Sequence, residues 1–136
     1  MVGIVIVTHG TMSEGLLDAA RMIVGEQEGI VGVGLLECDD VESLMERVAQ
    51  AVQQVETGDG TLVLVDVFGA SPFNASARLA MAGGNLEVLT GVSLPMVLEL
   101  AVQREGQSLQ ELVELAREAG ASGIKTLSET LGKGPS

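Results

Sequence analysis

Three polar residues lie shortly after apolar runs, where their side chains can do chemistry. His9 follows the apolar run 2–7, Asp66 follows the run 62–65, and Ser71 comes five residues after Asp66. The carboxyl ends of parallel strands meet at one edge of a sheet, so His9 and Asp66 are expected side by side. A carboxylate bound to one imidazole nitrogen fixes the tautomer and leaves the other nitrogen as a directed nucleophile. Such a histidine can carry a phosphoryl group.

The residues around Ser71 are expected to bind an anion. Pro72 suits the first position of a helix, so Ser71 is predicted to be its N-cap. A hydroxyl beside the free backbone donors of a helix start forms an anion site that the helix dipole strengthens. We expect Gly69, Ala70 and Gly10 to bring further backbone around the same phosphoryl oxygens. No cluster has metal-ligand spacing, so neither a metal nor another cofactor is expected.

Each of these residues also has an ordinary structural interpretation. His9 can be a polar cap on the sheet, Asp66 can cap a turn, and Ser71 can be no more than a helix cap. The convergence of all three favours chemistry. A hydrolase triad of Ser71, His9 and Asp66 is disfavoured because the G-x-S-x-G nucleophile elbow is absent. A flavin-binding module is disfavoured because the chain has two Phe, no Tyr and no Trp.

Composition narrows the class of protein further. The 136 residues are 46% hydrophobic and 19% charged, which predicts one folded domain. The formal net charge of −12 disfavours nucleic-acid and anionic-membrane partners. The single cysteine, Cys38, allows no intrachain disulfide. The sequence shows no signal peptide and no apolar stretch of membrane-spanning length, so a cytoplasmic protein is expected.

Strand and helix patterns alternate along the chain and predict an α/β fold. The fold class is an open, doubly wound, mostly parallel sheet with strand order 2-1-3-4 and helices on both faces. A short last strand is expected at Ile124–Leu127, residues 1–130 form the domain, and residues 131–136 form a flexible tail or linker stub. The other strands are predicted at 2–7, 30–36, 62–65 and 86–90. The predicted helices begin at Ser13, at Asp39 or Asp40, at Ser71, at Pro95 and at Ser108. The last of these helices is predicted to end at Gly120.

Three motifs, in order and spacing, resemble one known family over nearly the whole chain. They are Ile6-Val7-Thr8-His9-Gly10, the segment from Val65 to Asn74 that reads VDVFGASPFN, and Gly91-Val92-Ser93-Leu94-Pro95-Met96. Together they resemble the enzyme IIA domain of the mannose-family sugar phosphotransferase system.

The resemblance implies a phosphotransferase that relays a phosphoryl group through a phosphohistidine. His9 Nε2 would accept the group from the carrier HPr and pass it to enzyme IIB, with membrane sugar permease subunits as indirect partners. Asp66 would hold His9 Nδ1, and Ser71 with nearby backbone donors would bind the phosphoryl oxygens. Met12 and Phe68 are expected to face the partners. The resemblance also implies a homodimer in which the last strand is exchanged and pairs antiparallel with the neighbouring sheet.

Some alternatives stay open at the level of sequence. Ala70 stands where many family members carry a second glycine, which is expected to restrict the loop over His9. A phosphocarrier subunit of a dihydroxyacetone kinase, or a regulatory enzyme IIA-like domain, would use a similar module. The sequence does not decide whether enzyme IIB is a separate chain or follows residue 136, and it does not identify the sugar.

Overall fold

The computed structural model describes residues 1–132 and contains the predicted parallel sheet. Its strands are β1 (Gly3–His9), β2 (Ile30–Leu35), β3 (Thr61–Val65) and β4 (Leu86–Leu89). Their order is β2-β1-β3-β4, and each neighbouring pair is parallel. The predicted fold class and strand order are therefore confirmed.

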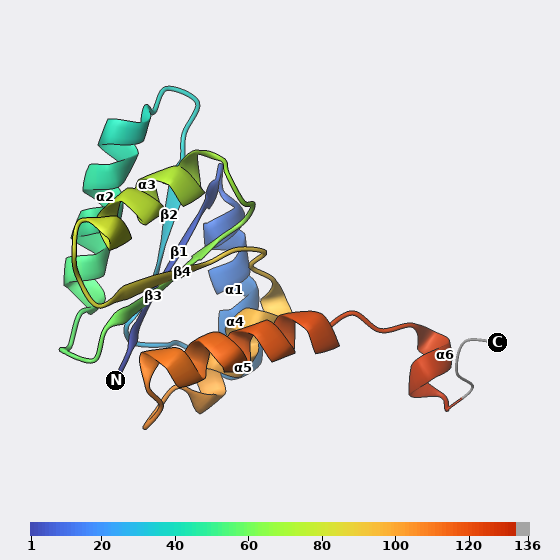
Figure 1. The fold of residues 1–136 in the computed structure, drawn as a ribbon. Helices are drawn as coiled ribbons and strands as arrows, with labels where there is room; N and C mark the ends of the chain where they lie inside the picture. Colours follow the sequence, from blue (N-terminus) through green and yellow to red (C-terminus); the bar gives the residue numbers. More distant parts are fainter. Residues whose placement is uncertain (133–136) are drawn as a thin grey trace.

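The sheet is covered on both faces because residues 4–7 of β1 and 62–65 of β3 are all apolar. In β1, Ile4 and Ile6 face one hydrophobic cluster while Val5 and Val7 face the other. Figure 1 shows the resulting layers. On the first face lie α1 (Met12–Val24), α4 (Leu94–Gln103) and α5 (Leu109–Ser122), and on the second face lie α2 (Val41–Val55) and α3 (Ser71–Met81).

Two predicted helix caps are wrong by one or two residues. The N-cap of α1 is Thr11, and Ser13 is buried inside the first turn. Its backbone N–H donates to the hydroxyl of Thr8 at 2.9 Å, so a side chain of β1 takes the place of a local cap. Similarly, α3 begins at Ser71 with Ala70 as its N-cap. Proline fits the second helical residue as well as the first, because neither N–H has an intrahelical partner.

The other helix boundaries follow the sequence more closely. Asp40 caps α2 through a bond from the Ser43 N–H, and Ser108 opens α5 with the predicted capping box. The predicted end of that helix at Gly120 is wrong, because α5 continues to Ser122.

The predicted last strand is not present in the single chain. Residues 124–126 are irregular, and Leu127 begins the short helix α6 (Leu127–Thr130). This segment stands away from the body of the molecule (Figure 1), and the side chains of Ile124 and Leu127 are exposed. A strand needs a partner for its backbone groups, and nothing within residues 1–132 pairs with this segment. Of the predicted tail, residues 133–136 lie outside the described part of the chain.

The topology singles out the edge of the sheet after β1 and β3. The chain leaves β1 toward β2 on one side and, after crossing back, continues from β3 to β4 on the other. Chemistry in open α/β sheets gathers at such a switch point. None of the helices in residues 1–132 is long and apolar enough to span a bilayer.

Candidate functional site

His9 and Asp66 meet at the switch point. The Nδ1 atom of His9 lies 2.7 Å from Asp66 Oδ2, and the same oxygen accepts the His9 backbone N–H at 2.8 Å. The imidazole is half exposed at 51%, whereas the carboxylate is only 11% exposed. The largely covered carboxylate thus holds the Nδ1 side of the ring and leaves Nε2 free of this contact.

Three hydrogen bonds keep the Asp66 carboxylate ionised. Burial alone would raise its pKa, but the backbone N–H of His9, the His9 ring and the backbone N–H of Val67 outweigh burial, so the pKa of Asp66 lies below its ordinary value. The Val67 N–H donates to Oδ1 at 2.9 Å, so both carboxylate oxygens are engaged. An ionised carboxylate at Nδ1 makes this nitrogen the protonated one in the neutral ring.

The backbone that carries His9 is fixed on both sides. Gly10 has a left-handed φ of 54°, which lets the chain turn sharply after β1, and its N–H donates to the Leu35 carbonyl at 2.8 Å. Thr8 anchors the start of α1 as described above. A Cβ on Gly34 would lie only 2.2 Å from the Gly10 carbonyl oxygen, so β2 passes close beneath this turn. The position of His9 is therefore set by β1, β2 and β3 together.

The loop after β3 presents the start of α3 without a side-chain cap. Ala70 is the N-cap residue and has no hydrogen-bonding side chain, so the first-turn N–H groups of α3 receive no side-chain cap. Gly69 makes the turn before it with a left-handed φ of 82°. Ala70 itself has a φ of −92°, which any residue adopts without strain. Alanine therefore introduces no backbone strain at this position, and its expected restriction of the loop over His9 stays a prediction.

Exposed apolar side chains surround this edge of the sheet. We call Met12, Leu36, Val67 and Phe68 the apolar rim; they are exposed by 44%, 56%, 52% and 78%. Phe68 stacks on Phe73 of α3 with ring centroids 4.6 Å apart. Apolar side chains grouped near a reactive group are typical of a protein-docking surface.

Comparison with known proteins identifies the family of the chain. Residues 3–117 match the family described as "PTS system fructose IIA component" (EIIA-man). The chain belongs to this family. It is 39% identical to the mannose-specific EIIAB component of Escherichia coli K12 over 93% of its own length, and it spans 39% of the length of that relative. It is 29% identical to the fructose-specific EIIA component of Bacillus subtilis over 98% of this chain and 91% of the relative.

Solved structures place the fold in the same group. A phosphotransferase system component EIIA from Streptococcus agalactiae superposes with a TM-score of 0.86 at 28% identity, covering 95% of this chain and 99% of the other. The mannose/sorbose-specific IIA subunit from Enterococcus faecalis gives 0.84 at 27% identity, covering 93% and 94%. The likeness to a sigma-54 interaction domain protein from Enterococcus faecalis, at 20% identity, concerns the fold alone. The chain thus has both the sequence and the fold of the EIIA family.

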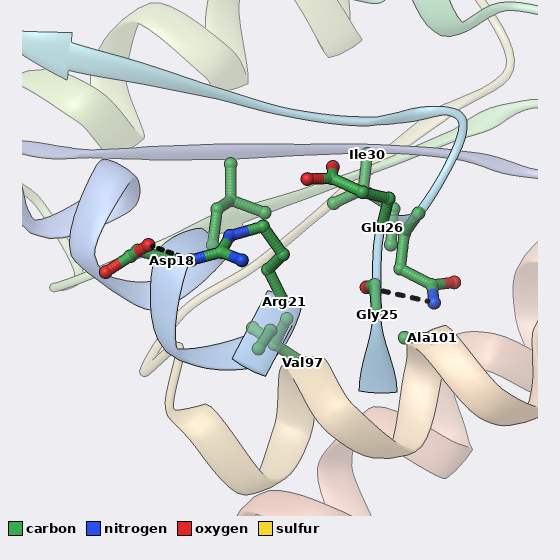
Figure 2. A pocket seen from close by; sticks show the side chains of 10 residues that line it. Asp18, Arg21, Gly25, Glu26, Ile30, Val97 and Ala101 are labelled. Atoms are coloured by element: carbon green, nitrogen blue, oxygen red, sulfur yellow. Dashed lines mark hydrogen bonds and ion pairs between the residues drawn. The ribbon is translucent and has the colours of Figure 1, made fainter. Parts of the chain in front are cut away.

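A separate pocket of this EIIA chain lies at the opposite end of the sheet, where the strands begin. It opens between α1, α4 and the start of β2, and an ion pair between Arg21 and Asp18 closes part of its rim (Figure 2). Ile30 in its wall pairs with Ile4, whereas Leu35 at the other end of β2 pairs with His9. The pocket therefore does not serve His9. Residues 1–132 contain no group of three or more potential metal ligands.

The structure brings most of the predicted site residues to one edge. His9, Asp66 and the loop 69–71 share it, as do Met12 and Phe68. The sequence reading missed two rim residues, Leu36 and Val67. Leu36 was predicted to be the last residue of a strand, whereas β2 ends at Leu35 and Leu36 follows it at the same end of the sheet as His9.

The Asp66 hydrogen bonds should be visible as a tautomer preference in His9. We expect nitrogen NMR of the neutral ring to show Nδ1 protonated and Nε2 unprotonated, because Nδ1 lies 2.7 Å from the carboxylate. In Asp66→Ala both tautomers become accessible. A wild-type ring protonated at Nε2 would contradict the assignment.

The lowered pKa of Asp66 also makes a contribution to stability that depends on pH. A carboxyl group whose pKa is depressed by folding stabilises the folded state above the ordinary value of 3.8, and this contribution disappears as the pH falls through the folded-state pKa. We expect Asp66→Asn to lower the unfolding free energy by about 1–2 kcal/mol at neutral pH and by less in acid. Denaturant titrations beside Glu46→Gln, an exposed control on α2, test this. A deficit that persists unchanged below the carboxyl range would exclude an ionic origin.

Proposed function

We propose that this chain is a phosphoryl carrier of a sugar phosphotransferase system, with His9 as the acceptor. The observation that carries the proposal is the 2.7 Å contact between His9 Nδ1 and Asp66, which leaves Nε2 of a half-exposed ring available to a partner protein. The membership of the EIIA family supports it. A phosphoryl donor must bring its own phosphohistidine within bonding distance, so a half-exposed acceptor at the end of a strand suits the task better than one in a deep pocket.

The proposed transfer exchanges one phosphorus–nitrogen bond for another. The Nε2 lone pair of His9 attacks the phosphorus of phospho-HPr, and the bond to the HPr histidine breaks with its electron pair returning to that ring. The Nδ1 proton stays on His9, where Asp66 offsets the positive charge that develops on the phosphorylated ring. The reverse sequence hands the group to enzyme IIB. Water takes no part, and no metal or other cofactor is proposed.

The loop 69–71 is proposed to hold the phosphoryl oxygens. The uncapped N–H groups at the start of α3 and the Ser71 hydroxyl would donate to them, and the helix dipole would favour their negative charge. Gly69 allows the close backbone approach, and Gly10 and Ala70 would line the same space. Because phosphoryl transfer depends mainly on positioning and charge stabilisation, these donors are sufficient machinery.

We propose HPr and enzyme IIB as successive partners on the apolar rim, with the sugar permease subunits as indirect partners. The transfer places the protein in the cytoplasm. We further propose a homodimer in which residues 124–127 of one copy pair antiparallel with β4 of the other, and a domain that ends near residue 130. These partners fit the mannose-specific and fructose-specific PTS systems named for the relatives, whereas a regulatory role rests on a fold likeness alone.

The transfer is tested by incubating the protein with phosphoenolpyruvate, enzyme I and HPr. We expect one acid-labile phosphoryl group by intact mass, and none in His9→Ala. Asp66→Ala should slow labelling by about a hundredfold, since tautomer and orientation are lost, and Ser71→Ala by about tenfold. Arg21→Ala, in the remote pocket, is the matched control and should label at the wild-type rate. Labelling retained in His9→Ala would overturn the proposal.

Charge should speed the encounter with HPr. The chain carries 19 acidic and 7 basic residues, so a basic face on the partner would be attracted. We expect the association rate, measured by stopped flow, to fall about tenfold between about 50 and 500 mM salt. Phe68→Ala should instead raise the dissociation rate and leave the salt dependence unchanged. An association rate indifferent to salt would contradict electrostatic steering.

A further inference from the structure

β4 is the outer strand of the sheet, and on its free side a carboxylate of the same strand accepts a backbone hydrogen bond. The carbonyl of Asn85 accepts the N–H of Thr61, so the backbone groups of residues 85 and 87 face β3 and those of Val88 face away from the sheet. The outward Val88 N–H donates to the Glu87 side chain at 2.9 Å. A strand that added to this edge would need the Val88 donor, and Glu87 would have to release it.

The only lysine in residues 1–132 lies in the segment that has no place on its own sheet. Lys125 is flanked by Ile124, which is 84% exposed, and Leu127, which is 74% exposed. Within the described chain Lys125 belongs to no ion pair. Apolar side chains held in water and an unused cation make this segment suited to an acidic strand edge.

We propose that Glu87 and Lys125 form an ion pair between two copies of this chain and so set the register of the exchanged segment. The inference rests on the homodimer proposed above. Lys125 of one copy lies opposite Glu87 of the other, and the carboxylate moves from the Val88 N–H to the ammonium group. The freed Val88 N–H then donates to the backbone carbonyl of Ile124, which lies opposite it in the antiparallel pair.

This register also places the apolar side chains correctly. Val88 and Leu86 pack on the cluster beneath α2 and α3, whereas Leu89 packs on the opposite face. Ile124 opposite Val88 therefore points toward an apolar cluster. A slip of one residue would turn Lys125 toward that cluster and bury its charge, which costs stability. A slip of two residues would place Gly123 or Leu127 opposite Glu87 and leave the carboxylate without a cation.

Charge reversal tests the pair. Each dimer contains the contact twice by symmetry. We expect Glu87→Lys and Lys125→Glu each to raise the dimer dissociation constant about tenfold or more, since like charges then oppose each other at both contacts. Mixing the two variants should restore wild-type affinity as a heterodimer, because both of its contacts pair unlike charges. Sedimentation velocity over a concentration series measures this. Glu46→Lys, the same charge change on α2, should leave the constant unchanged.

Each outcome decides the proposal. Restoration on mixing supports a contact between copies, whereas a segment folded back on its own sheet would give no restoration and overturn it. Glu87→Gln keeps an acceptor for Val88 without the charge; should Glu87→Lys fail to fold, a rise of about threefold in Glu87→Gln supports the pair and an unchanged constant overturns it. If the wild type is a dimer and the variants do not change its dissociation constant, the proposed register is overturned but the homodimer is not. A monomeric wild type overturns the homodimer too. HPr-dependent labelling of the same samples decides the carrier function independently.

Discussion

The hydrogen bond between His9 Nδ1 and Asp66 Oδ2 constrains the whole molecule. The two residues are 57 positions apart in sequence, and their contact of 2.7 Å requires β1 and β3 to be neighbours with parallel directions. It also requires the carboxylate to lie at the edge of the core, where it is 11% exposed. Backbone donors from the end of β1 and from the loop after β3 keep it ionised there. The chemistry of the site therefore depends on the strand order that places β1 beside β3.

A carrier histidine has to be rigid on one side and open on the other. A ring in free solution exchanges tautomers and rotamers, whereas a ring buried in a pocket is inaccessible to a second protein. The edge of a parallel sheet meets both needs, because the strand fixes the backbone and the neighbouring strand supplies the orienting carboxylate. The hollow between α1 and α4 at the far edge has no part in this arrangement.

The sequence predicts the parts that depend on local pattern and on the sheet alone. Continuous apolar runs predicted the strands and their order, and the capping box at Ser108 marked the start of α5. The caps at Ser13 and Ser71 were wrong, because Thr8 from another element and a permissive proline decide those boundaries. The exposure of Leu36 was not predicted, because the exposure of a residue at the end of a strand depends on which parts of the folded chain lie beside it. The strand at Ile124–Leu127 was wrong for the single chain, since strand formation needs a partner surface.

The acidic charge of the chain and the apolar rim near His9 both suit short-lived complexes. Long-range charge attraction acts before contact and accelerates association, but it adds little to the lifetime of a complex in salt. Lifetime depends on the desolvated contact area, and the apolar rim supplies four exposed side chains around His9. In the proposed relay the chain meets two partners in turn at one nitrogen atom, so a tight complex with either would block the other. A strong acidic charge with a small apolar rim therefore favours turnover over affinity.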